Sequence, residues 1–148
     1  MMRLSRELAP DVFVALLEEY ERFLGELLER MGGRDVDVDD DTCVAAFSSV
    51  KEAGLAAVAV QRAVAAHEWP HGRPVAMSVG IDSGEADLAT TRCEELCDAA
   101  EGGQIFVTET VSRLLEQERL ADFSVRDLGE VPLRRSDRSV RAYELVFH

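Results

Sequence analysis

The chain has 148 residues, which is about the length of one domain. Apolar residues make up 47% and charged residues 30% of it, a composition typical of a folded globular protein and not of a disordered segment. Acidic side chains outnumber basic ones 29 to 16, so the formal net charge is −13 at pH 7. Such a charge repels phosphate backbones and anionic lipids, so neither nucleic acid nor a membrane surface is an expected partner.

No apolar run approaches the roughly 18 residues of a membrane span, and the first residues lack the apolar stretch of a signal peptide. We therefore expect a cytoplasmic protein. Its three cysteines are Cys43, Cys93 and Cys97. An odd number of cysteines without a secretory signal does not predict a disulfide framework, and no second pair completes a zinc site. We expect all three thiols to be buried as small apolar groups.

Apolar positions recur with helical spacing from about Asp11 to Met31, and Gly32-Gly33 predicts the end of this first helix. Alternating aspartate and valine over residues 35–39, followed by the apolar run 43–47, predicts a β-hairpin. The tip of this hairpin is densely acidic. Two interpretations of the tip stay open, a weak site for a divalent cation and a solvated turn.

The pattern Ser49-x-x-Glu52 predicts the capped start of a second helix, which extends to about His67. Alternation predicts a strand with inward side chains at Val75, Met77, Val79 and Ile81. We then expect a helix over 92–100, a strand over 104–108, a helix over 109–115 and a final hairpin of 123–133 and 140–147. This order predicts an α+β fold in a single domain over residues 1–148, with one sheet and helices on one face.

Several segments, in this order along the chain, resemble the catalytic domain of class III nucleotidyl cyclases. The resemblance covers about Leu16 to Leu145. The segments that carry it are Ala45-Ala46-Phe47 with the following helix, residues 61–70, Val79-Gly80-Ile81-Asp82-Ser83-Gly84-Glu85-Ala86, residues 96–105 and Asp127-Leu128-Gly129-Glu130. It implies a ferredoxin-like two-layer sandwich. The family has an opening strand before its first long helix, and this chain has only a short lead there, so we expect that strand to be missing.

The resemblance also implies a reaction, in which the 3′-hydroxyl of a nucleoside triphosphate is joined to its own α-phosphate and pyrophosphate leaves. In the family, two aspartates hold two divalent cations that polarise the phosphates. A lysine, together with an aspartate or a threonine, selects the base. An asparagine and an arginine stabilise the transition state across a dimer interface.

Few of these residues are retained at the matching positions. The second metal position falls on Asp41, with Asp39 as a further candidate ligand, whereas the first metal aspartate has no counterpart. The base-selecting lysine falls on Asp37. The transition-state asparagine falls near Thr91 and the arginine on Glu95. The cation that contacts phosphate keeps its sign at Arg134, as a vestigial site.

We therefore expect a cyclase-like domain without catalytic activity, which acts as a signalling or regulatory module through a protein partner or a homodimer. Neither ATP nor GTP binding is expected, and no cofactor beyond weakly held Mg²⁺ or Mn²⁺. Two alternatives stay open. One is an active adenylate or guanylate cyclase whose missing residues come from a partner chain, and the other is a nucleotide-binding or metal-binding sensor without turnover.

Overall fold

The structure, a computed structural model, describes residues 2–4, 10–39, 42–69, 76–118, 123–134 and 136–147. The strands in these ranges are β1 (Met2–Leu4), β2 (Arg34–Asp39), β3 (Thr42–Ala46), β4 (Met77–Ile81), β5 (Ile105–Val107), β6 (Phe123–Pro132) and β7 (Ser139–Phe147). The helices are α1 (Pro10–Arg30), α2 (Val50–Ala66), α3 (Ala86–Ala99) and α4 (Glu109–Glu118). None of these helices is long and apolar enough to cross a membrane.

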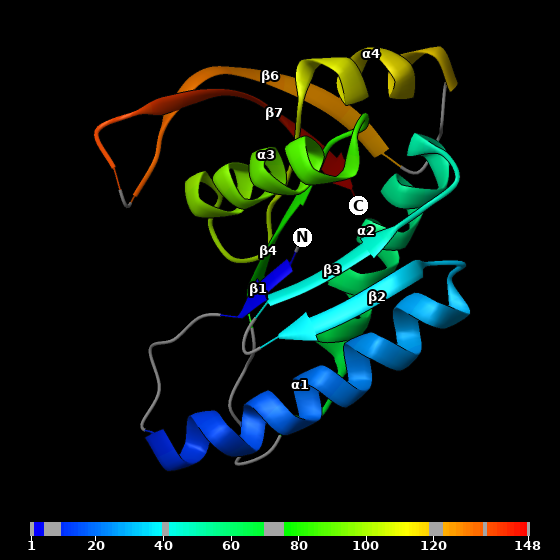
Figure 1. Cartoon of the computed structure of the whole chain (residues 1–148), viewed down its shortest axis with the longest axis vertical. Helices are drawn as coiled ribbons and strands as arrows, with labels where there is room; N and C mark the ends of the chain where they lie inside the picture. Colours follow the sequence, from blue (N-terminus) through cyan, green and yellow to red (C-terminus); the bar gives the residue numbers. More distant parts are fainter. Residues whose placement is uncertain are drawn as a thin grey trace.

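The strands form one seven-stranded sheet in the order β2-β3-β1-β4-β5-β7-β6. β4 and β5 are parallel, and the other neighbouring strands are antiparallel. In Figure 1, α1 runs beside β2 and β3 at one end of the long axis, and the β6–β7 hairpin and α4 lie at the other end. This arrangement confirms the α+β fold class expected from the sequence.

Helix α1 follows the apolar spacing of its sequence and ends at a glycine. Tyr20, Leu24 and Leu28 recur every four residues and are completely buried or nearly so. The helix ends where Gly32 adopts a φ of +92°, a backbone conformation that glycine reaches at little cost. The backbone N–H of Gly33 then donates to the carbonyl of Leu28 at 2.8 Å, which closes the last turn. The expected first helix is confirmed.

Helix α2 begins at the predicted cap. The Ser49 hydroxyl accepts a hydrogen bond from the backbone N–H of Glu52 at 3.1 Å. The alanine-rich face of the helix is buried against the sheet, with Ala56, Ala57 and Val60 almost fully enclosed. Small side chains allow this close approach of the helix to the sheet.

The expectation that the helices lie on one face of the sheet is wrong, because they cover both faces. Side chains of α1, α2 and α4 share one large core with Met77, Val79 and Ile81 of β4. Helix α3 packs on the opposite face, where the Ser78 hydroxyl donates to the carbonyl of Cys97 at 3.1 Å. The inward side chains expected on β4 are therefore buried, and the alternate positions Ser78 and Gly80 are buried as well. Val75 lies outside the described residues.

The expectation that the opening strand is missing is wrong. Residues Met2–Leu4 form β1, which lies between β3 and β4 and is antiparallel to both. Three residues are too short to show the alternation by which a strand is recognised in a sequence. Here the strand is defined by two neighbours that each offer an open edge.

Helix α3 differs from expectation in its length. It begins at Ala86, directly after Gly84 with a φ of +123°, whereas the sequence predicted a start near Arg92. Residues 86–91 contain neither glycine nor proline, so nothing in them stops a helix from starting at the Ser83-Gly84-Glu85 turn. The remaining predicted elements, from β5 to β7, are confirmed to within a few residues.

We predict opposite effects for two glycine-to-alanine variants. A Cβ atom at Gly80 would lie 2.6 Å from the Cys93 carbonyl oxygen and 2.9 Å from the Leu96 Cβ, so Gly80→Ala must push α3 away from β4. We expect a loss of about 1–3 kcal/mol in the free energy of unfolding. Gly25→Ala is the matched control, because nothing lies within 4 Å of the added carbon and the position is inside α1.

The expected result for Gly25→Ala is a gain of about 0.5–1 kcal/mol, because alanine loses less backbone entropy than glycine in a helix. Urea unfolding monitored by circular dichroism measures both values. Equal stability of the two variants would contradict the close packing of α3 on β4.

Candidate functional site

The positions matched to catalytic residues lie on three separate parts of the fold. Asp37 lies on β2, the first strand in the sheet order, and is exposed. Thr91 and Glu95 lie on α3, which packs on β4, β5 and β7. Arg134 lies in the connection between β6 and β7, at the other end of the sheet order. Asp37 and Arg134 therefore lie towards opposite ends of the sheet order.

The two predicted metal ligands are only partly placed. Asp39 is the last residue of β2, in register with Thr42 of β3. Asp41 lies outside the described residues. Nowhere in the described ranges do three or more His, Cys, Asp or Glu side chains gather closely enough to hold a metal ion.

Glu95 occupies the position that the resemblance assigns to an arginine, and it has a partner. Its carboxylate accepts a hydrogen bond from the Arg138 guanidinium at 3.4 Å and is 23% exposed. Thr91, one turn earlier, is exposed and its hydroxyl donates to the backbone carbonyl of Asp87 at 3.1 Å. This part of α3 therefore presents a carboxylate and a hydroxyl, and the nearby cation of Arg138 is already paired.

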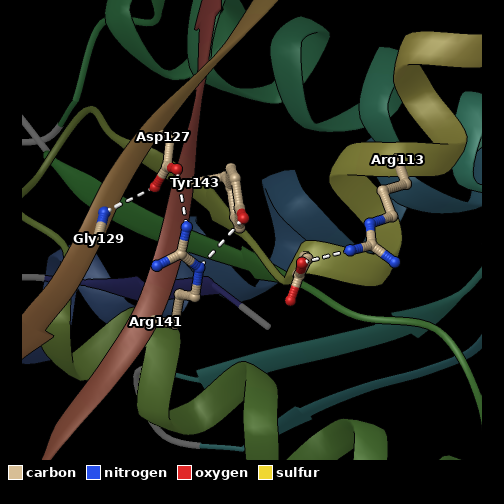
Figure 2. Close-up of polar contacts among 6 residues, drawn as sticks. Arg113, Asp127, Gly129, Arg141 and Tyr143 are labelled. Atoms are coloured by element: carbon tan, nitrogen blue, oxygen red, sulfur yellow. Dashed lines mark hydrogen bonds and ion pairs between the residues drawn. The ribbon is translucent and has the colours of Figure 1, made fainter.

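The basic residues of the β6–β7 hairpin are matched by acids of the same chain. Arg134 lies 3.8 Å from Glu101, and both side chains are well exposed. Figure 2 shows Arg141 between Asp127 and Tyr143, with 2.8 Å to the Asp127 carboxylate and 3.1 Å to the Tyr143 hydroxyl. These two neighbours raise the pKa of Arg141, so it stays charged. Arg135 lies outside the described residues.

Asp127 also orders the strand that carries it. Its second carboxylate oxygen accepts the backbone N–H of Gly129 at 2.8 Å, as Figure 2 shows. Gly129 has a φ of +68°, and the register between β6 and β7 shifts at this point, so the strand contains a bulge. Asp127 thus fixes the bulge and Arg141 together. The Asp127-Leu128-Gly129 segment has a structural role here.

Asp82 forms a polar centre with Arg92 and Thr108, which was not predicted from the sequence. Its carboxylate is 3% exposed, accepts the Thr108 hydroxyl at 2.7 Å and forms an ion pair with Arg92. Thr108 in turn caps α4 through the Val111 backbone N–H at 3.4 Å. The group therefore joins the end of β4 to both α3 and α4. The position was visible in the sequence, as a charged residue directly after a buried strand.

A pocket of about 560 Å³ opens beside this centre. Its walls come from the ends of β3 and β4, from α2 and from the first half of α3. The lining is mostly small and apolar, and its charged members among the described residues are Asp35 and Asp82. Because those described lining residues include no lysine or arginine, the pocket does not offer a phosphate group a counter-charge.

Two buried thiols, Cys43 and Cys93, also line this pocket. Burial raises the pKa of Cys43 to about 11, and burial raises the pKa of Cys93 as well. Both groups therefore remain neutral thiols at physiological pH. Cys97 is buried and free too, as expected for all three cysteines.

Comparison with known proteins establishes the fold. The guanylate cyclase domain of Catenaria anguillulae in complex with GTP superimposes with a TM-score of 0.71 at 10% identity, covering 99% of this chain and 93% of that one. An adenylate/guanylate cyclase/hydrolase of Silicibacter pomeroyi gives 0.68 at 20% identity, with 98% and 94% covered. This chain has the nucleotidyl cyclase fold. An adenylyl cyclase of P. aeruginosa gives 0.61 at 17% identity, with 99% and 91% covered.

The comparison by sequence adds relatives without a stated activity. Uncharacterized proteins of Mycobacterium tuberculosis and Mycobacterium bovis are 25% identical over 138 residues, which cover 86% of this chain. The alignment takes up 46% of each relative, so this cyclase-like chain spans about half their length. No family model matches the chain.

We predict that the buried thiol of Cys43 makes stability fall at high pH. The unfolded chain loses this proton near pH 9.0, and the folded protein keeps it until about pH 11. The folded state is therefore favoured fully below pH 9, and this advantage is lost as the pH rises towards 11, by up to about 3 kcal/mol.

Urea unfolding between pH 8 and pH 11 measures the effect. In Cys43→Ala we expect a distinctly shallower decline over the same interval, although this variant starts from a lower stability because of its cavity. The same slope in both proteins would show that other groups cause the decline.

Proposed function

We propose that this nucleotidyl cyclase-like domain does not turn over nucleoside triphosphates and acts as a signalling module through contact with a protein partner or a second copy of itself. The observation that carries the proposal is the Glu95–Arg138 ion pair. It puts a carboxylate where the family resemblance calls for a free cation.

The electrostatic argument starts from the charge of the substrate. A nucleoside triphosphate carries about four negative charges, and its transition state needs cations directed at the phosphates. Glu95 adds a negative charge at that position, and its neighbour Arg138 is already paired with it. Loss of one such donor costs roughly 10²–10³ in rate, before the replacement by an acid is counted.

Two further positions also weaken the attraction of a nucleoside triphosphate. Asp37, matched to the base-selecting lysine, is exposed on β2 and reverses the charge of that residue. Arg134, matched to the phosphate contact, lies 3.8 Å from Glu101, which offsets its charge. With a net charge of −13 for the whole chain, the protein repels a polyanion at long range as well.

The described residues do not fit the two-metal centre of the family. Such a centre needs carboxylates from the opening strand and from the following hairpin. β1 consists of Met2, Arg3 and Leu4, so it supplies no carboxylate. Asp39 and Asp41 are the candidate ligands for Mg²⁺ or Mn²⁺, which we expect to be held weakly. We derive no catalytic step through a metal.

We predict that the purified protein forms no cyclic nucleotide above background from ATP or GTP in the presence of Mn²⁺, with an active cyclase as the positive control. The physical reason is that repulsion prevents productive binding of the triphosphate. Turnover that disappears in Asp41→Ala would overturn the proposal and favour an active cyclase.

Nucleotide binding gives a second, more sensitive readout. We expect titration with a fluorescent ATP analogue to show no saturable binding to the natural chain, and measurably stronger binding to Glu95→Arg. Glu94→Arg is the matched control, because it changes the net charge equally at an exposed neighbouring position of α3. Tight binding to the natural chain would point instead to a nucleotide sensor. Equal effects of the two variants would show that only net charge matters.

A further inference from the structure

The first half of α3 has little buried surface. Most of its side chains between residues 86 and 92 are exposed, and Leu88 is 56% exposed. None of these residues belongs to either apolar core of the described structure. The second half of the helix has four buried side chains, Cys93, Leu96, Cys97 and Ala99. Because helices in proteins are stabilised mainly by the packing of an apolar face, the first half lacks the main source of helix stability.

The local sequence of this half does not make up for the missing burial. Glu85 occupies the N-cap position of α3 but its side chain makes no capping hydrogen bond, whereas Ser49 caps α2. Thr90 and Thr91 are β-branched, and β-branched residues have a lower helix propensity. The hydroxyl of Thr91 donates to the carbonyl of Asp87 at 3.1 Å, a type of contact that slightly destabilises a helix. The helical form of residues 86–92 therefore depends on a contact with the rest of the fold.

That contact is the ion pair between Arg92 and Asp82. Asp82 follows β4 directly, its side chain is 3% exposed, and the Thr108 hydroxyl donates to it at 2.7 Å. A carboxylate so deeply buried is unfavourable without its cation, so the pair opposes unwinding of the helix through Arg92. The Arg92 side chain is 47% exposed, so it can leave Asp82 without any opening of the apolar cores.

We propose that residues 86–92 form a switch segment, which unwinds and refolds while residues 93–99 stay helical, and that the Asp82–Arg92 ion pair holds it in the helical form. Cys93, directly after the segment, is 9% exposed in this form and loses the cover of the preceding turn when the segment unwinds. A domain with two such forms responds to any partner that binds one of them better. This inference goes beyond the proposed function, because it does not depend on whether a nucleotide is turned over.

Hydrogen exchange of the folded protein measures the switch segment residue by residue. The amides of residues 89–92 report on it, since the first N–H groups of a helix have no acceptor within the helix. In the natural chain we expect these amides to exchange faster than those of residues 96–99, because local opening costs less free energy where little apolar surface is buried. Equal protection of the two halves would overturn the proposal.

Removal of the ion pair tests what holds the segment. In Arg92→Gln we expect exchange at residues 89–92 to accelerate by about tenfold, with little change at residues 96–99. Asp82→Asn should have the same effect, because its amide oxygen still accepts the Thr108 hydroxyl and only the charge is lost. If Asp82→Asn fails to fold, Arg92→Gln alone decides, since its side chain is half exposed. Equal acceleration in both halves of α3 would mean that the pair supports the whole fold, and would refute the proposal.

Arg113→Gln is the matched control. It removes an ion pair from another helix, where Arg113 lies 2.7 Å from Glu109 and both side chains are exposed. Exposed pairs of this kind contribute little to stability, so exchange at residues 89–92 should stay as in the natural chain. An acceleration there equal to that in Arg92→Gln would show that the loss of any surface cation is enough, and would contradict the role of Asp82.

Thiol labelling distinguishes unwinding from a small increase in local motion. Cys93, Cys43 and Cys97 are all buried, so each reacts with N-ethylmaleimide only when the structure around it opens. In Arg92→Gln we expect mass spectrometry to show about tenfold faster labelling of Cys93, with the other two thiols unchanged. Parallel increases at all three thiols would indicate global unfolding and would overturn the proposal.

Neither measurement involves a nucleotide. A segment that does not unwind leaves the absence of turnover unaffected, and discovery of turnover leaves the exchange and labelling results unchanged. The two proposals can therefore fail separately.

Discussion

The close contact between β4 and α3 is the constraint on which the rest of the structure depends. β4 is buried along its whole length. Its odd-numbered side chains belong to the large core, whereas α3 covers the opposite face of the strand. A glycine at position 80 is the reason this is possible, because the Cys93 carbonyl occupies the space that a side chain would need. With α3 so close, the Asp82 carboxylate reaches both Arg92 and Thr108. The polar centre and the pocket beside it follow from that approach.

In the function that we propose, electrostatics, and not the loss of the scaffold, distinguishes this chain from a working cyclase. Arginines of the β6–β7 hairpin are present, but those in the described residues pair with acids of the same chain, among them Glu95, Glu101 and Asp127. Exposed pairs of this kind contribute little to stability. Their effect is on the surface potential, because each pair offsets a cation that would otherwise attract phosphate.

Much of the fold could be predicted from the sequence, because periodic burial and helix-terminating residues are local signals. Helix α1 with its Gly32 ending and helix α2 with its Ser49 cap are examples. β1 could not be predicted, because its three residues become a strand only through neighbours distant in sequence. The burial of Ser78 and Gly80 was missed for a similar reason, since it depends on which face α3 covers.

The candidate site was predictable only in part. Glu95 and Arg134 are located by resemblance, yet their ion-pair partners come from other elements and could not be read from spacing. Asp41 lies outside the described residues, so its role as a metal ligand stays a prediction.

The two cores of this domain are of unequal size, and that asymmetry bears on its motions. The core under α3 is the smaller, with Leu96, Ala99 and Phe106 among its buried members, and it is closed at its rim by partly buried side chains of the β6–β7 hairpin such as Leu128 and Val131. Regions with few buried apolar contacts open at lower free-energy cost than the global unfolding of a protein. Local fluctuations should therefore concentrate on the α3 side, while the sheet and its three other helices remain intact beneath it.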